Sequence, residues 1–290
     1  MANSVFRIKG HESFIPREGW LNKGIHAVAQ DPAVFARNAG ADTLGVGTNM
    51  AKSIRYWLKT IGLTIDVGGR GVTLSELGEI IARNDPYIED VFTLWVLHTN
   101  LARNQELATS WFLFFNEIDV SVFKREELTE MMMDRLLTLT GADSLPERSV
   151  KDDCSAILSM YCPAKEKSND PEDKNASSPF AQLGLLTAQG KDGYEKIRPA
   201  ADAIDPLLVY YILSDKLLAA GFLSIDELVY EVNMPGKVLN LNRVILNDHL
   251  DALQNQGHII VNRTAGLDVI YPDSRITAID AISLYYGGQQ

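Results

Sequence analysis

Apolar residues recur at spacings of three and four positions along much of this chain, the pattern of helices that bury one face. The clearest case is the stretch 48–61, where Met50, Ile54, Trp57 and Ile61 follow that spacing and the next residue is a glycine. Lysine and arginine stand at several of the positions between them. The pattern therefore predicts an amphipathic helix with one apolar face and one basic face.

Shorter patterned segments surround this helix. Residues 20–30 predict a helix that ends at an Asp-Pro pair, and two further helices are expected over 32–40 and 42–45. Residues 63–74 alternate apolar and polar positions around a glycine-rich tip, which predicts a β-hairpin. A short helix, a turn, an amphipathic helix and a hairpin in this order predict a winged helix-turn-helix, whose amphipathic helix enters the major groove of DNA.

The middle of the chain is predicted to be helical. Helical periodicity covers 75–142 and returns over 149–161, and the segment 108–118 is apolar nearly all round, as in a central core helix. Residues 163–179 hold no aliphatic side chain larger than alanine, which predicts a solvated loop. A hairpin is expected over 183–197, around a turn that contains two glycines.

The C-terminal part repeats the winged-helix pattern. A helix over 206–217 precedes Ser224, which is expected to cap the next helix together with Glu227 in a capping box. An amphipathic helix is predicted over 242–257 and a hairpin over 258–272. This order of elements predicts a second winged helix.

The predicted fold class is mainly α with short β-hairpins, with winged helix-turn-helix units at the N- and C-terminal ends joined by a helical core. The expected domains are an N-terminal DNA-binding unit over 1–75, a helical core over 76–162, a flexible polar loop over 163–179 and a C-terminal winged-helix domain over 180–290.

Charge is distributed unevenly between the two predicted winged helices. The whole chain has a formal net charge of −11, yet residues 1–75 hold nine Lys and Arg against five Asp and Glu, a net charge of +4. Residues 205–275 hold five basic and nine acidic side chains, a net charge of −4. The first unit is therefore predicted to bind double-stranded DNA, and the second to dock on a protein or to form a homodimer.

The basic face of the helix over 48–61 carries Lys52, Arg55 and Lys59. Spaced cations often form only a solvated helix face, and that alternative stays open. The polar helix start favours nucleic acid, because phosphates and base edges are reached from such positions. The predicted DNA contacts are Lys23, Thr48, Asn49, Lys52, Arg55, Lys59 and Arg70.

Polar and aromatic residues are dense over 10–24, ahead of the first helix. Cleavage of a phosphodiester needs an activated nucleophile and positive charge on the phosphate. Our candidates are His11 as a base or water-orienting group, Glu12 as a metal ligand and Arg17 as a phosphate contact. The metal would be Mg²⁺ or Mn²⁺, with its further ligands unknown. The alternative is that local hydrogen bonds satisfy His11 and Glu12, with Arg17 paired to Glu12.

Other chemistry is absent or weak in the sequence. No Walker loop is present, so no nucleotide cofactor is expected. The acidic pair Asp152-Asp153 is interpreted as helix-surface carboxylates. Cys154 and Cys162 are expected to be reduced structural thiols. With no apolar run of transmembrane length and no secretory signal, we expect a cytoplasmic protein without a membrane partner.

Four motifs are distinctive in their spacing: F-x-x-x-G-H-E-S-F from residue 6, R-x-G-W-L-x-K-G from residue 17, L-G-V-G-x-N-M-x-x-S-I-R-Y-W-L over 44–58, and S-P-F-A-Q-L-G-L-L over 178–186. Together they resemble a bacterial family of unknown function whose members occur with DNA phosphorothioation and phage-defence genes. The resemblance extends over essentially the whole chain.

This resemblance implies an enzyme, a DNA nickase that opens one strand so that partners can replace a non-bridging phosphate oxygen by sulfur. The implied partners are a cysteine desulfurase and ATP-using enzymes. The resemblance supplies no catalytic residue. Two alternatives remain, a DNA-reading adaptor that recruits the modification enzymes without cleaving DNA, and a winged-helix transcriptional regulator.

Overall fold

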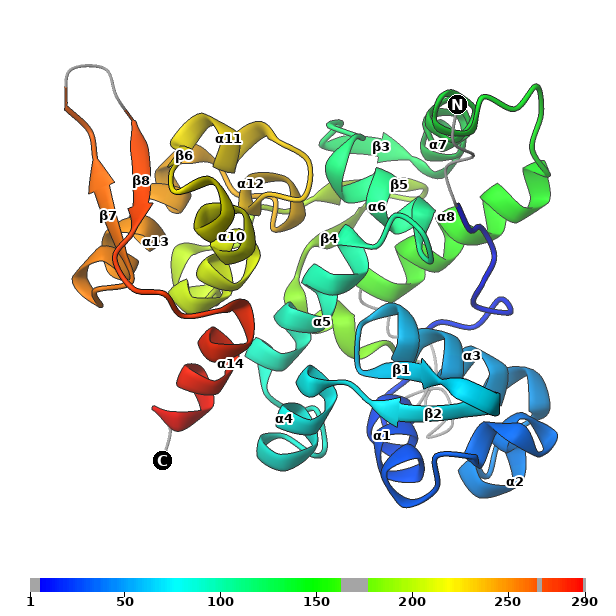
Figure 1. Cartoon of the computed structure of the whole chain (residues 1–290). Coiled ribbons are helices and arrows are strands. Elements are labelled where there is room, and N and C mark those ends of the chain that lie inside the picture. The colour runs from blue at the N-terminus through cyan, green and yellow to red at the C-terminus, as the bar shows by residue number, and fades with distance from the viewer. Residues whose placement is uncertain (1–5, 163–176, 265–267, 289–290) are drawn as a thin grey trace. The chain divides into compact units, whose positions relative to one another are not determined.

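The computed structural model describes residues 6–162, 177–264 and 268–288, and the chain folds into two compact units, Met1–Ile197 and Arg198–Gln290. Both units are mainly helical with small antiparallel sheets (Figure 1), as the sequence predicts. Among the described helices, none has both the length and the apolar character needed to cross a membrane.

The first unit begins with helices around one hairpin. Its elements are α1 (Trp20–Gln30), η1 (Val34–Ala36), η2 (Asn38–Gly40), α2 (Ala41–Leu44), α3 (Thr48–Thr60), β1 (Thr64–Val67), η3 (Gly68–Arg70) and β2 (Gly71–Leu74).

The remainder of this unit is a helical core followed by a hairpin. Its elements are α4 (Glu76–Asn84), α5 (Val91–Arg103), α6 (Thr109–Asn116), β3 (Val122–Lys124), α7 (Arg125–Thr140), α8 (Glu147–Tyr161), η4 (Pro179–Leu183), β4 (Leu186–Gln189) and β5 (Gly193–Lys196). Every residue of α6 is buried, which confirms the predicted central core helix.

The second unit contains the helices and the hairpin expected from the C-terminal pattern, together with elements that the pattern did not indicate. They are η5 (Ala201–Ala203), α10 (Pro206–Ala220), β6 (Leu223–Ser224), α11 (Ile225–Tyr230), α12 (Pro235–Val238), α13 (Arg243–Asn255), β7 (Ile259–Asn262), β8 (Val269–Pro272) and α14 (Ala278–Gly287). The predicted capping box is confirmed, because Ser224 Oγ accepts from Glu227 N–H at 3.1 Å and Glu227 Oε2 accepts from Ser224 N–H at 2.7 Å.

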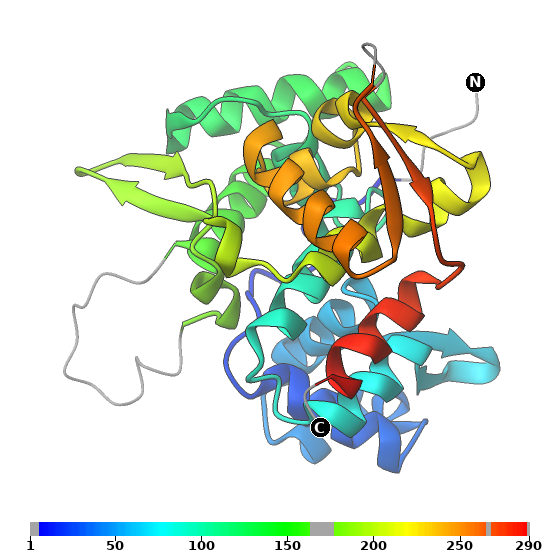
Figure 2. The same ribbon diagram turned by 90° about the vertical axis from the view of Figure 1, so that its left-hand side faces the viewer.

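Two sheets in the described residues share one strand order. In the first unit the order is β3-β5-β4, and in the second it is β6-β8-β7, so that each first strand pairs with the last strand of its set. Val122 pairs with Glu195 in the first sheet, and Leu223 pairs with Ile270 in the second. The remaining strand of each sheet forms a hairpin with the last strand. In the first unit β4 pairs with β5, and in the second β7 pairs with β8 (Figure 2).

The two N-terminal helices α1 and α3 cross closely at a glycine. A Cβ atom on Gly24 of α1 would lie 2.6 Å from Leu58 Cδ1 and 3.1 Å from Ile54 Cγ2, both on α3. Ile54, Trp57 and Leu58 are fully buried at this contact. The apolar face predicted for α3 is therefore packed inward, and this fixes which of its side chains face solvent.

The structure differs from the sequence prediction over 32–40. Two short 3-10 turns replace the expected helix, because Asn38 and Ala39 adopt left-handed backbone angles, with φ of 43° and 52°, that an α-helix cannot contain.

The chain also divides at a different place from the predicted domain ends. Residues 1–75 and 76–162 lie in one compact unit, which continues to Ile197 because β5 returns to pair with β3. Of the predicted loop 163–179, the part 163–176 lies outside the described residues. The part that follows is ordered, with Ser178 buried ahead of η4.

Candidate nucleic-acid interface

Helix α3 places cations on the side opposite its buried face. Lys52 and Lys59 are exposed and Arg55 is half-buried, at spacings of three and four residues that bring them to one side of the helix. The guanidinium carbon of Arg55 also lies 5.7 Å from the ring centroid of Phe35 in η1. The basic face predicted from the sequence is thus present on the surface of the first unit.

Asp66 on β1 joins two of these cations. Its Oδ1 lies 3.0 Å from Arg55 Nη2, and its Oδ2 lies 2.6 Å from Lys59 Nζ. The ammonium of Lys59, and after it the guanidinium of Arg55, hold the pKa of the Asp66 carboxyl below its ordinary value. The carboxylate is therefore ionised at neutral pH and offsets part of the positive charge of α3.

The other predicted DNA contacts come from α1, from the first turn of α3 and from η3. Thr48 and Asn49 are exposed in the first turn of α3, and the Thr48 hydroxyl donates to Asn38 Oδ1 at 3.2 Å. Lys23 is exposed on α1, the helix that packs against α3. Lys52 has no ion pair with any described residue. The side chain of Arg70 lies outside what the structure describes, so its predicted role stays a prediction.

His11 takes a position that the sequence did not indicate. Its side chain is only 1% exposed, and its Nε2 lies 3.0 Å from Asp153 Oδ1 on α8. The same carboxylate accepts the Lys9 backbone N–H at 2.9 Å and the Ser110 hydroxyl at 2.6 Å. The interpretation of Asp153 as a surface carboxylate is therefore wrong: α8 turns it into the core, and Asp152 alone faces outward to pair with Lys9.

Aromatic rings enclose the His11 side chain. The Trp57 ring is stacked on it at a centroid distance of 5.9 Å, and the Trp111 ring meets it edge-on at 5.5 Å. The indole N–H of Trp57 and the hydroxyl of Ser53 both donate to the carbonyl oxygen of Phe14, at 2.9 and 3.2 Å. The N-terminal arm, residues 6–16, is thereby tied to α3 on one side and to α6 and α8 on the other.

The structure does not bring the three catalytic candidates together. Glu12 is exposed on the arm, in a left-handed conformation with φ of 50°, whereas His11 is buried beside it. No ion pair joins Glu12 to Arg17 in the described residues, and the Arg17 guanidinium carbon instead lies 5.4 Å from the Trp20 ring centroid. Catalytic roles for these residues stay a prediction, and a role for His11 at a phosphate would require the arm to expose the ring.

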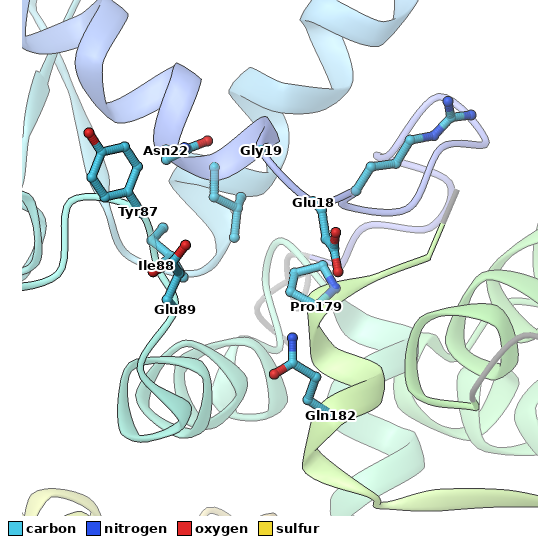
Figure 3. A pocket seen from close by; sticks show the side chains of 10 residues that line it. Glu18, Gly19, Asn22, Tyr87, Ile88, Glu89, Pro179 and Gln182 are labelled. Atoms are coloured by element: carbon cyan, nitrogen blue, oxygen red, sulfur yellow. The ribbon is translucent and has the colours of Figure 1, made fainter. Parts of the chain in front are cut away.

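Arg17 lines a pocket of about 470 Å³ beside the start of α1. Figure 3 shows Tyr87 and Glu89 on one side of this pocket and Glu18 with Pro179 on the other. Two carboxylates against one guanidinium make the lining unfavourable for a phosphodiester. The charge of the pocket lining is therefore acidic, unlike the basic face of α3.

The loop that carries Tyr87 and Glu89 is held by a buried carboxylate. Asp85 accepts the backbone N–H of Glu89 at 3.0 Å and the hydroxyl of Thr93 at 2.6 Å. Ile88 adopts a φ of 57°, a conformation that costs energy for a β-branched residue. Sequence reasoning missed this loop, because the only local signal was an Asp-Pro pair that also ends helices.

No three His, Cys, Asp or Glu side chains gather as a metal-binding group in the part of the chain that the structure describes. Cys154 and Cys162 are not joined in a disulfide, and burial raises the pKa of Cys154 to about 12, which makes it a poor nucleophile.

Comparisons with known proteins place this arrangement in context. The chain is similar to two solved structures, described as the magnesium ion-bound SspB crystal structure, with 25% sequence identity and a TM-score of 0.84, and the SspB crystal structure, with 24% identity and a TM-score of 0.85. Each match covers 98% of this chain and 88% of the other. A search of curated proteins gives no match.

A family model described as protein of unknown function (DUF4007) matches residues 8–286, which include the basic helix α3 and most of the N-terminal arm and of both compact units. The motifs that suggested a family of unknown function all lie within this matched range, apart from the first two residues of the first motif. The chain therefore belongs to the DUF4007 family.

Proposed function

We propose that this protein binds double-stranded DNA in a phosphorothioate-based phage-defence system and nicks one strand so that sulfur can enter the backbone. The observation that carries the DNA-binding part is the exposed basic face of α3, formed by Lys52, Arg55 and Lys59. Nicking and sulfur incorporation follow from the family resemblance, to which the likeness to SspB adds support.

The elements around α3 suit a winged helix-turn-helix. Helix α2 precedes α3 by a three-residue turn, and the β1–β2 hairpin follows it directly, in the position of a wing. In this proposal α3 lies in the major groove, with Thr48 and Asn49 at its N-terminal end near base edges and phosphates. Lys23 and Arg70 are proposed to contact the flanking backbone.

The second unit has the same order of elements with opposite charge. Helix α13 presents Val244, whose side chain is 68% exposed, on the same side as the exposed carboxylate of Asp248. Carboxylates beside an exposed apolar group repel phosphate and suit a basic protein surface. We propose that this unit docks on a protein, either a phosphorothioation partner such as the cysteine desulfurase or the ATP-using enzymes, or a second copy of this chain.

A non-catalytic adaptor is the second candidate, and the burial of His11 favours it. A base must reach its proton within hydrogen-bonding distance, whereas the His11 ring is 1% exposed and occupied by Asp153. An adaptor would use the same α3 face to hold DNA while the partner enzymes act on it.

A supercoiled-plasmid assay separates these proposals. Wild-type protein is incubated with Mg²⁺ or Mn²⁺, and with chelator, beside the double variant Lys52→Ala/Arg55→Ala. The control is Lys151→Ala, which removes an exposed cation paired with Glu147 on α8. We expect open-circle product from wild type and from the control, and much less from the double variant.

Each other result changes the conclusion. Intact DNA binding without open-circle product favours the adaptor. If the double variant nicks DNA as well as wild type does, α3 is not part of the DNA interface. Absence of both nicking and DNA binding refutes the proposed function.

A further inference from the structure

The two cations nearest the C-terminal end of the α3 face do not stand free. Arg55 and Lys59 approach different oxygens of one carboxylate, Asp66, at 3.0 and 2.6 Å. The hairpin register explains why this residue faces α3. Asp66 lies opposite Val72, which is buried, while the strand neighbours Ile65 and Val67 point to the other side and are exposed.

A carboxylate in this position resembles a phosphodiester in its charge and in the hydrogen bonds that it accepts. Both groups carry one negative charge on two oxygens, and both accept charge-assisted hydrogen bonds from guanidinium and ammonium groups. Building on the proposed DNA binding, we propose that Arg55 and Lys59 form a subsite for one DNA phosphate, and that Asp66 occupies this subsite until DNA displaces it.

Exchange of the carboxylate for a phosphate is feasible in this geometry. The side chains of Arg55, Lys59 and Asp66 are 40%, 44% and 42% exposed, so water and salt weaken their ion pairs. The group keeps an excess of one positive charge, which still attracts DNA. Arg55 also stays in contact with the Phe35 ring, 5.7 Å from its centroid, which holds the guanidinium in place when Asp66 leaves.

The test replaces Asp66 by its neutral isostere in the full-length protein. Binding of a labelled DNA duplex is measured by fluorescence anisotropy over a series of salt concentrations. Asp66→Asn is expected to bind about three- to tenfold more tightly than wild type near 0.1 M salt, and to steepen the slope of log K against log salt by up to about one, because no displaced carboxylate then remains to offset the charge neutralised at the phosphate.

A matched control distinguishes a local subsite from a general charge effect. Asp42→Asn makes the same change in net charge on the exposed α2, where Asp42 accepts only from the Asn38 side chain and pairs with no cation in the described structure. It should leave the salt slope unchanged and raise affinity by less than twofold. In the background Arg55→Ala/Lys59→Ala, the Asp66→Asn change should lose its effect on the slope.

The results separate this inference from the proposed function. If wild type binds DNA and Asp66→Asn behaves like Asp42→Asn, the subsite is refuted while DNA binding stands. An effect of Asp66→Asn that persists without Arg55 and Lys59 also refutes it. Absence of binding by wild type and by every variant overturns both.

Discussion

Loss of the buried carboxylate of Asp153 should destabilise the first unit strongly. In Asp153→Ala the hydroxyl of Ser110 and the ring of His11, which are 0% and 1% exposed, lose their acceptor, and the Lys9 backbone N–H loses one as well. A buried donor left without an acceptor costs about 1–3 kcal/mol. For the Ser110 hydroxyl and the His11 ring together, the expected loss in the free energy of unfolding is about 2–6 kcal/mol.

This loss is large enough to measure by thermal unfolding. For a unit of this size each kcal/mol lowers the melting midpoint by about 2–4 °C, so a loss of about 4 kcal/mol corresponds to about 8–16 °C. The assay follows helical circular dichroism during heating. Asp153→Asn keeps an acceptor oxygen and should fall between the wild type and the alanine variant.

The adjacent residue provides the control. Asp152 forms an ion pair with Lys9 at 2.6 Å, with the two side chains 31% and 36% exposed. Such an exposed pair contributes about 1 kcal/mol or less, so Asp152→Ala should lower the midpoint by no more than about 4 °C. If the two alanine variants melt within about 4 °C of each other, the view of Asp153 as the acceptor that holds the N-terminal arm is wrong.

Three further predictions concern the two units. Arg55→Ala should weaken DNA binding at all sequences and reduce the salt slope by roughly one, measured by anisotropy, and an unchanged slope would remove Arg55 from the phosphate contacts. A fragment of residues 1–197 should keep most of the DNA affinity of the full chain, and a folded fragment that no longer binds would assign that affinity to the acidic unit. The Ser224 backbone N–H and then its hydroxyl, against burial, hold the pKa of Glu227 below its ordinary value of 4.5. Glu227 therefore stabilises the second unit above the unfolded-state pKa and loses that effect as pH falls through the lower folded-state pKa. Glu227→Gln should melt lower than wild type at pH 7 and equally at about pH 2, and a constant difference across this range would contradict the assignment.

Local sequence patterns predicted most of the helices and hairpins. The apolar spacing of α3 and the alternation that follows it depend only on near neighbours, and the structure has both elements where they were expected. The partner of His11 could not be found in this way, because Asp153 lies far along the chain and an acidic pair such as Asp152-Asp153 also suits a solvated helix face. Only the packing of α8 against the arm decides that it faces inward.

The contacts of Asp66 show a further limit of prediction from the sequence. Its charge and its strand were visible in the sequence, but contact with Arg55 and Lys59 depends on the hairpin register, and a shift of one residue would have turned the carboxylate away. The 3-10 turns over 32–40 were missed for a different reason. The left-handed conformation of Ala39 has no local signal in the sequence, because glycine, asparagine and aspartate are the residues that favour it.

The strand order of the first unit has a consequence for how the chain folds. Strand β3 cannot pair until β5 has been synthesised, since Val122 pairs with Glu195 and the intervening chain is made first. The β4–β5 hairpin closes over a short turn and can form early once it is made, whereas its docking on β3 carries the entropy cost of a long loop. On the ribosome, we therefore expect α1 to α6 to assemble before the sheet, and a chain that stops short of residue 193 to leave β3 as an unpaired edge open to association with other chains.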